Sequence, residues 1–117
     1  MRIAAASSDG KLINQHFGHA KDFYIFEKEA DRFRYLELRS GKPFCNGGEH
    51  DDNELADAIN LITDCSYVLV VQIGNGAELE LNKRGIIAKI TRGFFDDCLK
   101  EFHNELAEGE SIHESIK

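Results

Sequence analysis

The sequence lacks several features that define specialised classes of protein. It has no tryptophan, one proline and only three cysteines in 117 residues. A small, odd number of cysteines does not build a disulfide framework, and so little proline excludes collagen-like and proline-rich chains. The longest apolar stretch, residues 67–73, is interrupted by Gln72 and is far shorter than the ~20 residues that span a bilayer. We therefore expect one globular domain with no membrane span and no signal peptide, in the cytoplasm.

Basic residues are also in deficit, with 14 Lys and Arg against 21 Asp and Glu and a net charge of −7. Phosphate binding needs clustered Lys and Arg, so nucleic acid is not expected as a partner. The acidic excess is unevenly placed. Residues 41–60 carry a net −4 and residues 93–117 a net −5, whereas residues 1–40 and 61–92 each carry +1. The first part of the chain is thus close to neutral.

The apolar pattern predicts five strands and three helices. Strands are expected over residues 2–8, 22–29, 32–39, 66–73 and 86–91, and helices over residues 51–63, 77–84 and 93–107. Residues 11–21 are expected to form a loop with at most one helical turn, and residues 40–51 the longest irregular segment. The order β-β-β-α-β-α-β-α predicts an α/β fold with a five-stranded mixed sheet and helices on its faces. Residues 1–107 would form this single domain, and residues 108–117 a frayed, polar C-terminal tail.

The strongest candidate site is the stretch His16-Phe17-Gly18-His19. Two imidazoles three residues apart can converge on one metal if the segment is helical, and Gly18 lets the backbone approach a bound object. Alternatively, both histidines are ordinary polar loop residues. Two ligands do not complete a structural zinc site, so further ligands would have to come from elsewhere. His103 and His113 are expected on the surface of the last helix and the tail.

Cys45 is the third candidate ligand, and His50 follows it in the same glycine-rich segment. A thiolate favours zinc, copper(I) or iron–sulfur species, whereas imidazole is less selective. The alternative is an unreactive loop thiol. Cys65 precedes a buried strand and Cys98 lies on the apolar face of the last helix, so both are expected to be small core residues.

The sequence offers no recognisable arrangement of catalytic residues. The pairs Asp51-Asp52 and Asp96-Asp97 fall at expected helix starts, where acids favour the helix dipole. Gly74-Asn75-Gly76 lacks the third glycine of a dinucleotide fingerprint and is interpreted as a strand-to-helix turn, although the helix N-terminus could face an anion. The centre of the first strand, residues 4–6, is all alanine, so a two-metal nuclease would lack its carboxylate.

The opening of the chain, the stretch from Asn14 to Ala20 and the segment around Cys45 together resemble the dinitrogenase iron-molybdenum cofactor biosynthesis family. That family includes small cofactor carriers and the C-terminal domain of the radical enzyme that builds the cofactor's iron–sulfur core. The resemblance covers about residues 1–107 and rests on the opening Arg2 to Gly10, Asn14-Gln15-His16-Phe17-Gly18-His19-Ala20, Cys45 with Gly47-Gly48, Asp64-Cys65, Ile73-Gly74, Leu81 and Gly85-Ile86.

The resemblance implies a ribonuclease-H-like α/β fold without nuclease activity. It also implies binding of the iron-molybdenum cofactor or a precursor iron–sulfur cluster, exchanged with metallocofactor assembly proteins. The implied binding residues are His16 and His19, with Cys45 as a further ligand and Gly18 beside them. Because no radical-enzyme cysteine motif is present, the resemblance implies a carrier and not an enzyme. A mononuclear zinc or copper module using the same ligands, or a hydrolase on the same fold, are the alternatives.

Overall fold

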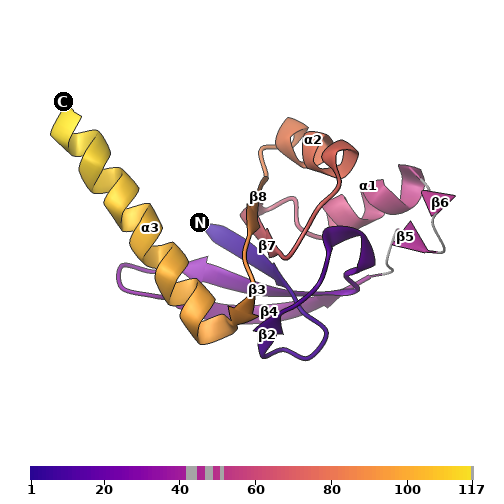
Figure 1. The fold of residues 1–117 in the computed structure, drawn as a ribbon, viewed down its shortest axis with the longest axis horizontal. Helices are drawn as coiled ribbons and strands as arrows, with labels where there is room; N and C mark the ends of the chain where they lie inside the picture. The colour runs from indigo at the N-terminus through magenta and orange to yellow at the C-terminus, as the bar shows by residue number, and fades with distance from the viewer. Residues whose placement is uncertain (42–44, 47–48, 51, 117) are drawn as a thin grey trace.

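A computed structural model describes residues 1–41, 45–46, 49–50 and 52–116, with side chains over residues 1–41 and 55–109. Its main sheet has five strands in the order β4-β3-β1-β7-β8 (Figure 1). The strands are β1 (Arg2–Ala6), β3 (Asp22–Lys28), β4 (Phe33–Ser40), β7 (Cys65–Val70) and β8 (Ile87–Ile90). β1, β3 and β4 are antiparallel neighbours, whereas β1, β7 and β8 run parallel. The predicted five-stranded mixed sheet is therefore confirmed, while the ribonuclease-H-like assignment stays a prediction.

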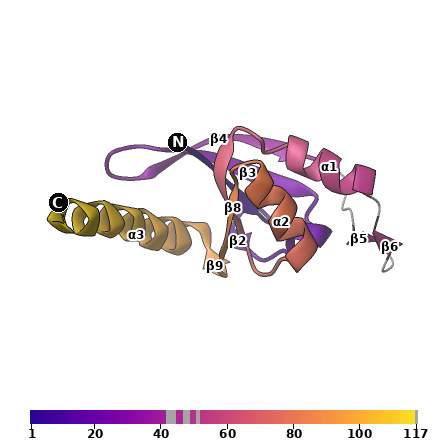
Figure 2. The same ribbon diagram turned by 90° about the horizontal axis from the view of Figure 1, so that it is seen from above.

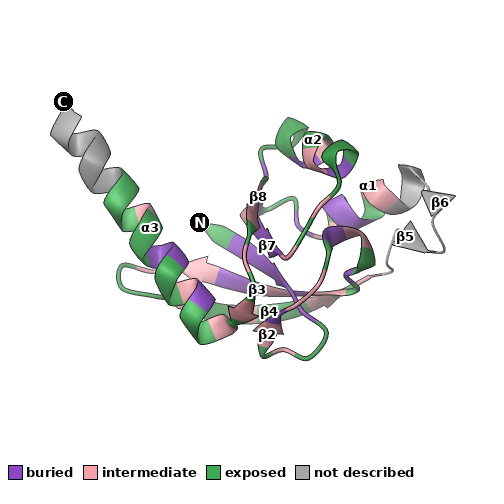
Figure 3. Cartoon of the chain, in the orientation of Figure 1, coloured by how far each residue is buried: buried purple, intermediate pink, exposed green. Residues whose placement is uncertain are grey.

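The central strands β1 and β7 are buried on both faces, as the purple ribbon in Figure 3 shows. Successive side chains of a strand point to opposite faces. Ala4 of β1 accordingly packs with Val68 of β7 in one cluster, and Ala5 packs with Leu69 in the other. The continuous apolar run of β7 is the pattern expected of a parallel strand covered on both sides.

Helices cover the two faces of the sheet. α1 (Asp52–Asn60) and α2 (Asn75–Lys83) contribute Ile59 and Leu81 to the first cluster. α3 (Phe95–Ile116) contributes Cys98 and Phe102 to the second, and it lies apart from α1 and α2 in both views (Figures 1 and 2). Among the described residues, no helix is long and apolar enough to span a membrane.

Four short strands were not predicted. β2 (Leu12–Ile13) pairs with β9 (Gly93–Phe94), and β5 (Cys45–Asn46) pairs with β6 (Glu49–His50) inside the segment expected to be irregular. Strands of two residues are too short to produce a periodic pattern. The 3-10 helix η1 (Phe17–His19) is the single turn that was expected in the first loop.

Helix ends and one histidine also differ from the prediction. α1 ends at Asn60, before residue 63, and α3 begins at Phe95 because Gly93 has φ +128°, which is not helical. α3 then continues to Ile116, beyond residue 107 where the helix was expected to end. His103 is buried, not on the surface, and its Nε2 lies 2.8 Å from the carbonyl oxygen of Glu29 in the β3–β4 turn.

Candidate functional site

A compact polar turn follows β1. The Ser7 hydroxyl accepts hydrogen bonds from the backbone N–H groups of Asp9 and Gly10, at 3.2 and 3.0 Å. Asp9 Oδ1 accepts from the N–H groups of Lys11 and Leu12, at 2.9 and 3.0 Å, and these bonds hold the pKa of Asp9 below its ordinary value. The first acidic side chain after this strand therefore closes a turn, as Ser and Asp side chains commonly do.

Asn14 ties the following loop to this turn. Its Oδ1 accepts from the Ser8 backbone N–H at 3.0 Å, and its Nδ2 donates to the Ser8 hydroxyl at 3.0 Å. The Asn14 backbone N–H donates to the carbonyl of Ala6, the last residue of β1. The histidine loop is thus anchored at its start to the carboxyl end of β1.

The loop is anchored a second time at the end of β7. Phe17 N–H donates to the carbonyl of Gln72 at 2.9 Å, and Val71 N–H donates to the carbonyl of Gln15 at 3.0 Å, so His16 forms an isolated parallel bridge with Gln72. β1 and β7 are parallel, and their carboxyl ends share one edge of the sheet. Ligands of open α/β sheets bind at that edge, which is where the histidine loop lies.

His16 and His19 are brought together on the surface. Their rings stack with centroids 5.3 Å apart and an interplanar angle of 20°, and both side chains are exposed. Phe17, which lies between them in the sequence, is fully buried and packs against Phe23, so it anchors the turn in the core. Gly18 lies within η1 and does not use a positive φ. The structure therefore presents two adjacent, exposed imidazoles whose ring nitrogens are available to a ligand.

Cys45 is placed only by its backbone, because its side chain lies outside the described part of the chain. Its strand β5 is in contact with η1, so the structure brings the glycine-rich segment to the histidine loop. α2 starts close by, with Gly74 as its N-cap two residues after Gln72. Among described side chains, no group of three or more His, Cys, Asp or Glu residues is arranged to hold a metal ion.

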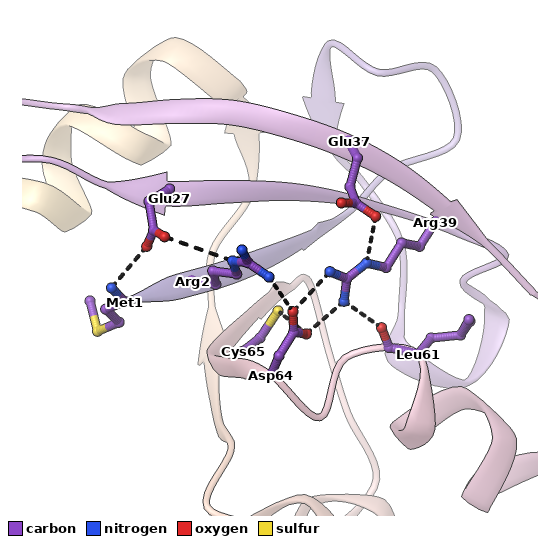
Figure 4. A network of polar contacts seen from close by, with 8 residues as sticks. All are labelled: Met1, Arg2, Glu27, Glu37, Arg39, Leu61, Asp64 and Cys65. Atoms are coloured by element: carbon purple, nitrogen blue, oxygen red, sulfur yellow. Dashed lines mark hydrogen bonds and ion pairs between the residues drawn. The ribbon is translucent and has the colours of Figure 1, made fainter.

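Sequence reasoning missed a charged network around Asp64, the residue that precedes β7, drawn in Figure 4. Arg39 of β4 donates to both oxygens of Asp64 at 2.6 and 2.9 Å, and Arg2 of β1 donates to the same carboxylate at 2.8 Å. The hydrogen bonds from Arg39 hold the pKa of Asp64 well below its usual range, and Asp64 in turn raises the pKa of Arg39. No sequence spacing relates these three residues, since they come from separate elements.

The two cysteines expected in the core are buried there. Cys65 is 4% exposed and Cys98 is 6% exposed, which confirms that prediction. Burial, with the neighbouring Asp64 carboxylate as a lesser cause, raises the pKa of Cys65 to about 12. A thiol with so high a pKa is not a ready metal ligand at neutral pH.

The sheet and the exposed histidine pair at its carboxyl edge define a small α/β domain with a candidate ligand-binding loop. A sequence model of the family described as dinitrogenase iron-molybdenum cofactor matches residues 1–105. The chain belongs to this family, and the resemblance found in its sequence is confirmed.

Curated relatives are about one-third identical to the chain. The FeMo cofactor biosynthesis protein NifB of Sinorhizobium fredii is 34% identical over 94 residues, which cover 80% of this chain and 19% of that protein. The protein of the same name from Klebsiella pneumoniae is 35% identical over 89 residues, covering 72% and 19%. The chain thus spans about a fifth of the length of these relatives.

Two solved structures share the fold. PH0822 matches with a TM-score of 0.70 and 24% identity over 90% of this chain and 92% of that one. A Methanocaldococcus jannaschii protein matches with a TM-score of 0.59 and 13% identity over 90% and 89%. At this identity the likeness concerns the fold alone.

Proposed function

We propose that this chain binds and carries the iron-molybdenum cofactor, or a precursor iron–sulfur cluster, as a non-enzymatic step of nitrogenase-type cofactor assembly. The cluster is the cargo, bound by His16 and His19 with Cys45 as a further ligand, and the partners are metallocofactor assembly proteins. The observation that carries the proposal is the exposed, stacked histidine pair in a chain of this family. The curated relatives are named for FeMo cofactor biosynthesis.

The geometry suits reversible capture. A closed site with four strong ligands holds a metal as part of the structure, whereas an open site with fewer protein ligands leaves positions for exchange. His16 and His19 lie on the surface, and neither imidazole makes a hydrogen bond within the described residues. The surrounding polar residues, such as Asn14, are instead used to hold the loop.

The charge distribution supports an anionic cargo at this loop. Metal–sulfur clusters are usually anionic, and the net charge of −7 would oppose their binding if it were spread evenly. Residues 1–40, which contain the histidine loop, carry +1, whereas the acidic excess lies in residues 41–60 and 93–117. The N-terminus of α2, with Gly74 as its N-cap, adds a positive helix-dipole end near the bridge between His16 and Gln72.

The test is retention of a defined cluster under anaerobic conditions. The protein is mixed with purified iron-molybdenum cofactor, and separately with a synthetic iron–sulfur cluster, then freed of unbound cluster by gel filtration. We expect the wild type to retain iron and sulfide, and His16→Ala or His19→Ala to weaken binding at least tenfold. His113→Ala, which removes a histidine near the C-terminal end of α3, is the matched control and should bind as the wild type does.

Each failure has a distinct meaning. If the wild type retains no iron, molybdenum or sulfide, cluster carriage is wrong. If it retains cluster and both loop variants do so equally well, the histidine assignment is wrong. Purification with one zinc or copper per chain and no sulfide would instead support the mononuclear metal module.

A further inference from the structure

β8 is an edge strand of the main sheet and is open on one side. The strand order is β4-β3-β1-β7-β8, so among the described strands β8 has β7 as its single hydrogen-bonded neighbour. The Thr91 N–H donates to the carbonyl of Val70, and the backbone groups of successive residues in a strand alternate in direction. The N–H and C=O groups of Ala88 and Ile90 therefore point away from β7. They form a template on which one more strand can pair.

The opposite edge of the sheet is protected against such pairing, whereas β8 is not. Edge strands are commonly protected by charged side chains and by bulges. β4 carries Arg34, Glu37 and Arg39, and its pairing with β3 contains a register shift. The four residues of β8 include one charged side chain, Lys89, whose ammonium is held by Glu105 of α3 at 2.8 Å. The ion pair draws this charge toward α3 and leaves the edge accessible.

Two large apolar side chains lie along this edge, one on each face of the sheet. Ile87 is 53% exposed and Ile90 is 54% exposed. Ile87 is paired with Tyr67 and Ile90 with Val70, and these two residues of β7 pack into the clusters on opposite faces of the sheet. An added strand would therefore find one isoleucine to pack against on each of its faces.

Exposed arginines stand before and after the strand. Residues 82–92 contain four Lys and Arg and no Asp or Glu, and the lysines of this stretch are already paired with glutamates. Arg84 and Arg92 are exposed, and neither forms an ion pair among the described side chains. Glu101 of α3, which lines a cavity beside the strand, offsets only one of these charges. The open edge is thus locally positive in a chain of net charge −7.

The carboxyl end of β8 lies at the edge of the sheet that carries the histidine loop. β7 and β8 are parallel, and the residues after β7 lead directly to Gln72, which forms the bridge with His16. A strand paired with β8 would reach the same edge of the sheet. A protein docked there is therefore placed beside the exposed imidazoles without covering them.

We infer that β8 is a docking edge for an extended acidic strand of a partner protein, which pairs with the backbone of Ala88 and Ile90 and directs carboxylates to Arg84 and Arg92. In this mode of recognition main-chain hydrogen bonds supply affinity and side chains supply specificity. A second copy of this chain fits less well, because it would bring the same uncompensated arginines to the edge. That the partner is a metallocofactor assembly protein rests on the proposed function, whereas the strand pairing does not.

The probe is a fluorescein-labelled peptide, Asp-Glu-Val-Thr-Val-Thr-Val-Glu-Asp, titrated with the full chain and followed by fluorescence anisotropy. The matched control peptide, Lys-Arg-Val-Thr-Val-Thr-Val-Arg-Lys, keeps the apolar pattern and reverses the charge. We expect the acidic peptide to bind at least about tenfold more tightly than the basic one. Hydrogen exchange of the Ala88 and Ile90 amides should slow when the acidic peptide is bound.

Variants of the edge separate the backbone from the charges. Ile90→Pro removes the outward N–H at a position where an edge strand tolerates proline, and should abolish binding. Ile90→Ala keeps that N–H and should weaken binding less. The double variant Arg84→Gln and Arg92→Gln leaves the backbone intact and should lower the affinity for the acidic peptide about tenfold. Lys83→Gln is its control, since Lys83 is already paired with Glu80. Thermal unfolding of each variant shows that it is folded.

The outcomes separate this inference from the proposed function. If the acidic peptide does not bind, or binds Ile90→Pro and the double arginine variant as it binds the wild type, the docking edge is wrong. Cluster retention by the wild type would still uphold the proposed function in that case. If the peptide binds as described but the wild type retains no cluster, the docking edge stands and the partner's role in cluster assembly is wrong. A dimer in sedimentation analysis that Ile90→Pro abolishes would identify a second copy as the occupant and overturn the acidic partner.

Discussion

Arg39 and Asp64 form a two-pronged ion pair between β4 and the start of β7. Both guanidinium Nη atoms donate to the carboxylate, at 2.6 and 2.9 Å, and Arg39 also donates to the carbonyl of Leu61 at 2.8 Å. Arg2 binds the same carboxylate from β1 (Figure 4). The Asp64 carboxylate thereby links β1 and β4 to the residues that precede β7.

Asp64→Asn is expected to destabilise the fold by roughly 1–2 kcal/mol. The Arg39 side chain is only 18% exposed and would lose one of its two charged partners, keeping Glu37. The free energy of unfolding in urea at neutral pH measures the effect. Glu80→Gln is the control, since it removes an exposed pair with Lys83 on α2 and should cost about 0–0.5 kcal/mol. Equal losses in the two variants would contradict a structural role for Asp64.

The contribution of Asp64 should also depend on pH. The arginines bind the carboxylate form, so the pKa of Asp64 is lower in the folded protein than its ordinary value near 4. Its stabilisation is therefore fully present above the pKa of the unfolded chain and is lost as the pH falls toward the folded pKa. The stability difference between wild type and Asp64→Asn should shrink from roughly pH 5 to pH 2. Parallel decline of both proteins over that range would disprove the linkage.

Thiol reactivity should separate the core cysteines from Cys45. Burial raises the pKa of Cys65 to about 12, and Cys98 is 6% exposed, so neither should react with Ellman's reagent in the native protein at neutral pH. The variant Cys45→Ser isolates them. We expect no labelling of this variant when native, and labelling of both remaining thiols in denaturant. Rapid labelling of the native variant would show that the core at β7 or α3 opens.

Gly10 is required by the turn after β1. Its φ is +74°, and an added Cβ would lie 2.9 Å from the hydroxyl of Tyr24. Gly10→Ala should therefore cost about 1–3 kcal/mol of unfolding free energy. Gly74→Ala is the matched control, because Gly74 has φ −74° and nothing within 4 Å of a built Cβ. If both substitutions are tolerated equally, the strain at Gly10 is not real.

Asn14 should act as a positioning residue for the histidine loop. Asn14→Ala removes both hydrogen bonds to Ser8, and we expect several-fold weaker cluster binding together with altered histidine ring signals in the NMR spectrum. Asn14→Asp keeps the acceptor oxygen and should recover part of the affinity. Asn104→Ala on the exposed side of α3 is the control. Unchanged ring signals with weakened binding would contradict a positioning role.

The main elements could be predicted from local pattern. The β-branched run of β7 and the helical spacing of Leu99, Phe102 and Leu106 depend only on neighbouring residues, and each appears where expected. His103 was misplaced because it borders that apolar stripe, and its burial depends on the β3–β4 turn, whose Glu29 carbonyl lies against it. Periodicity within α3 carries no information about that turn.

By itself, the sequence determined the alternation of strands and helices and the loop that carries His16 and His19, since these follow from residue type and short-range spacing. Only the tertiary structure decided that the two imidazoles stack, that β5, which carries Cys45, lies against the histidine loop, and that Arg39 meets Asp64. The last two of these relationships join segments far apart along the chain. They exist because the folded sheet and its connecting loops bring those segments together, which no local pattern encodes.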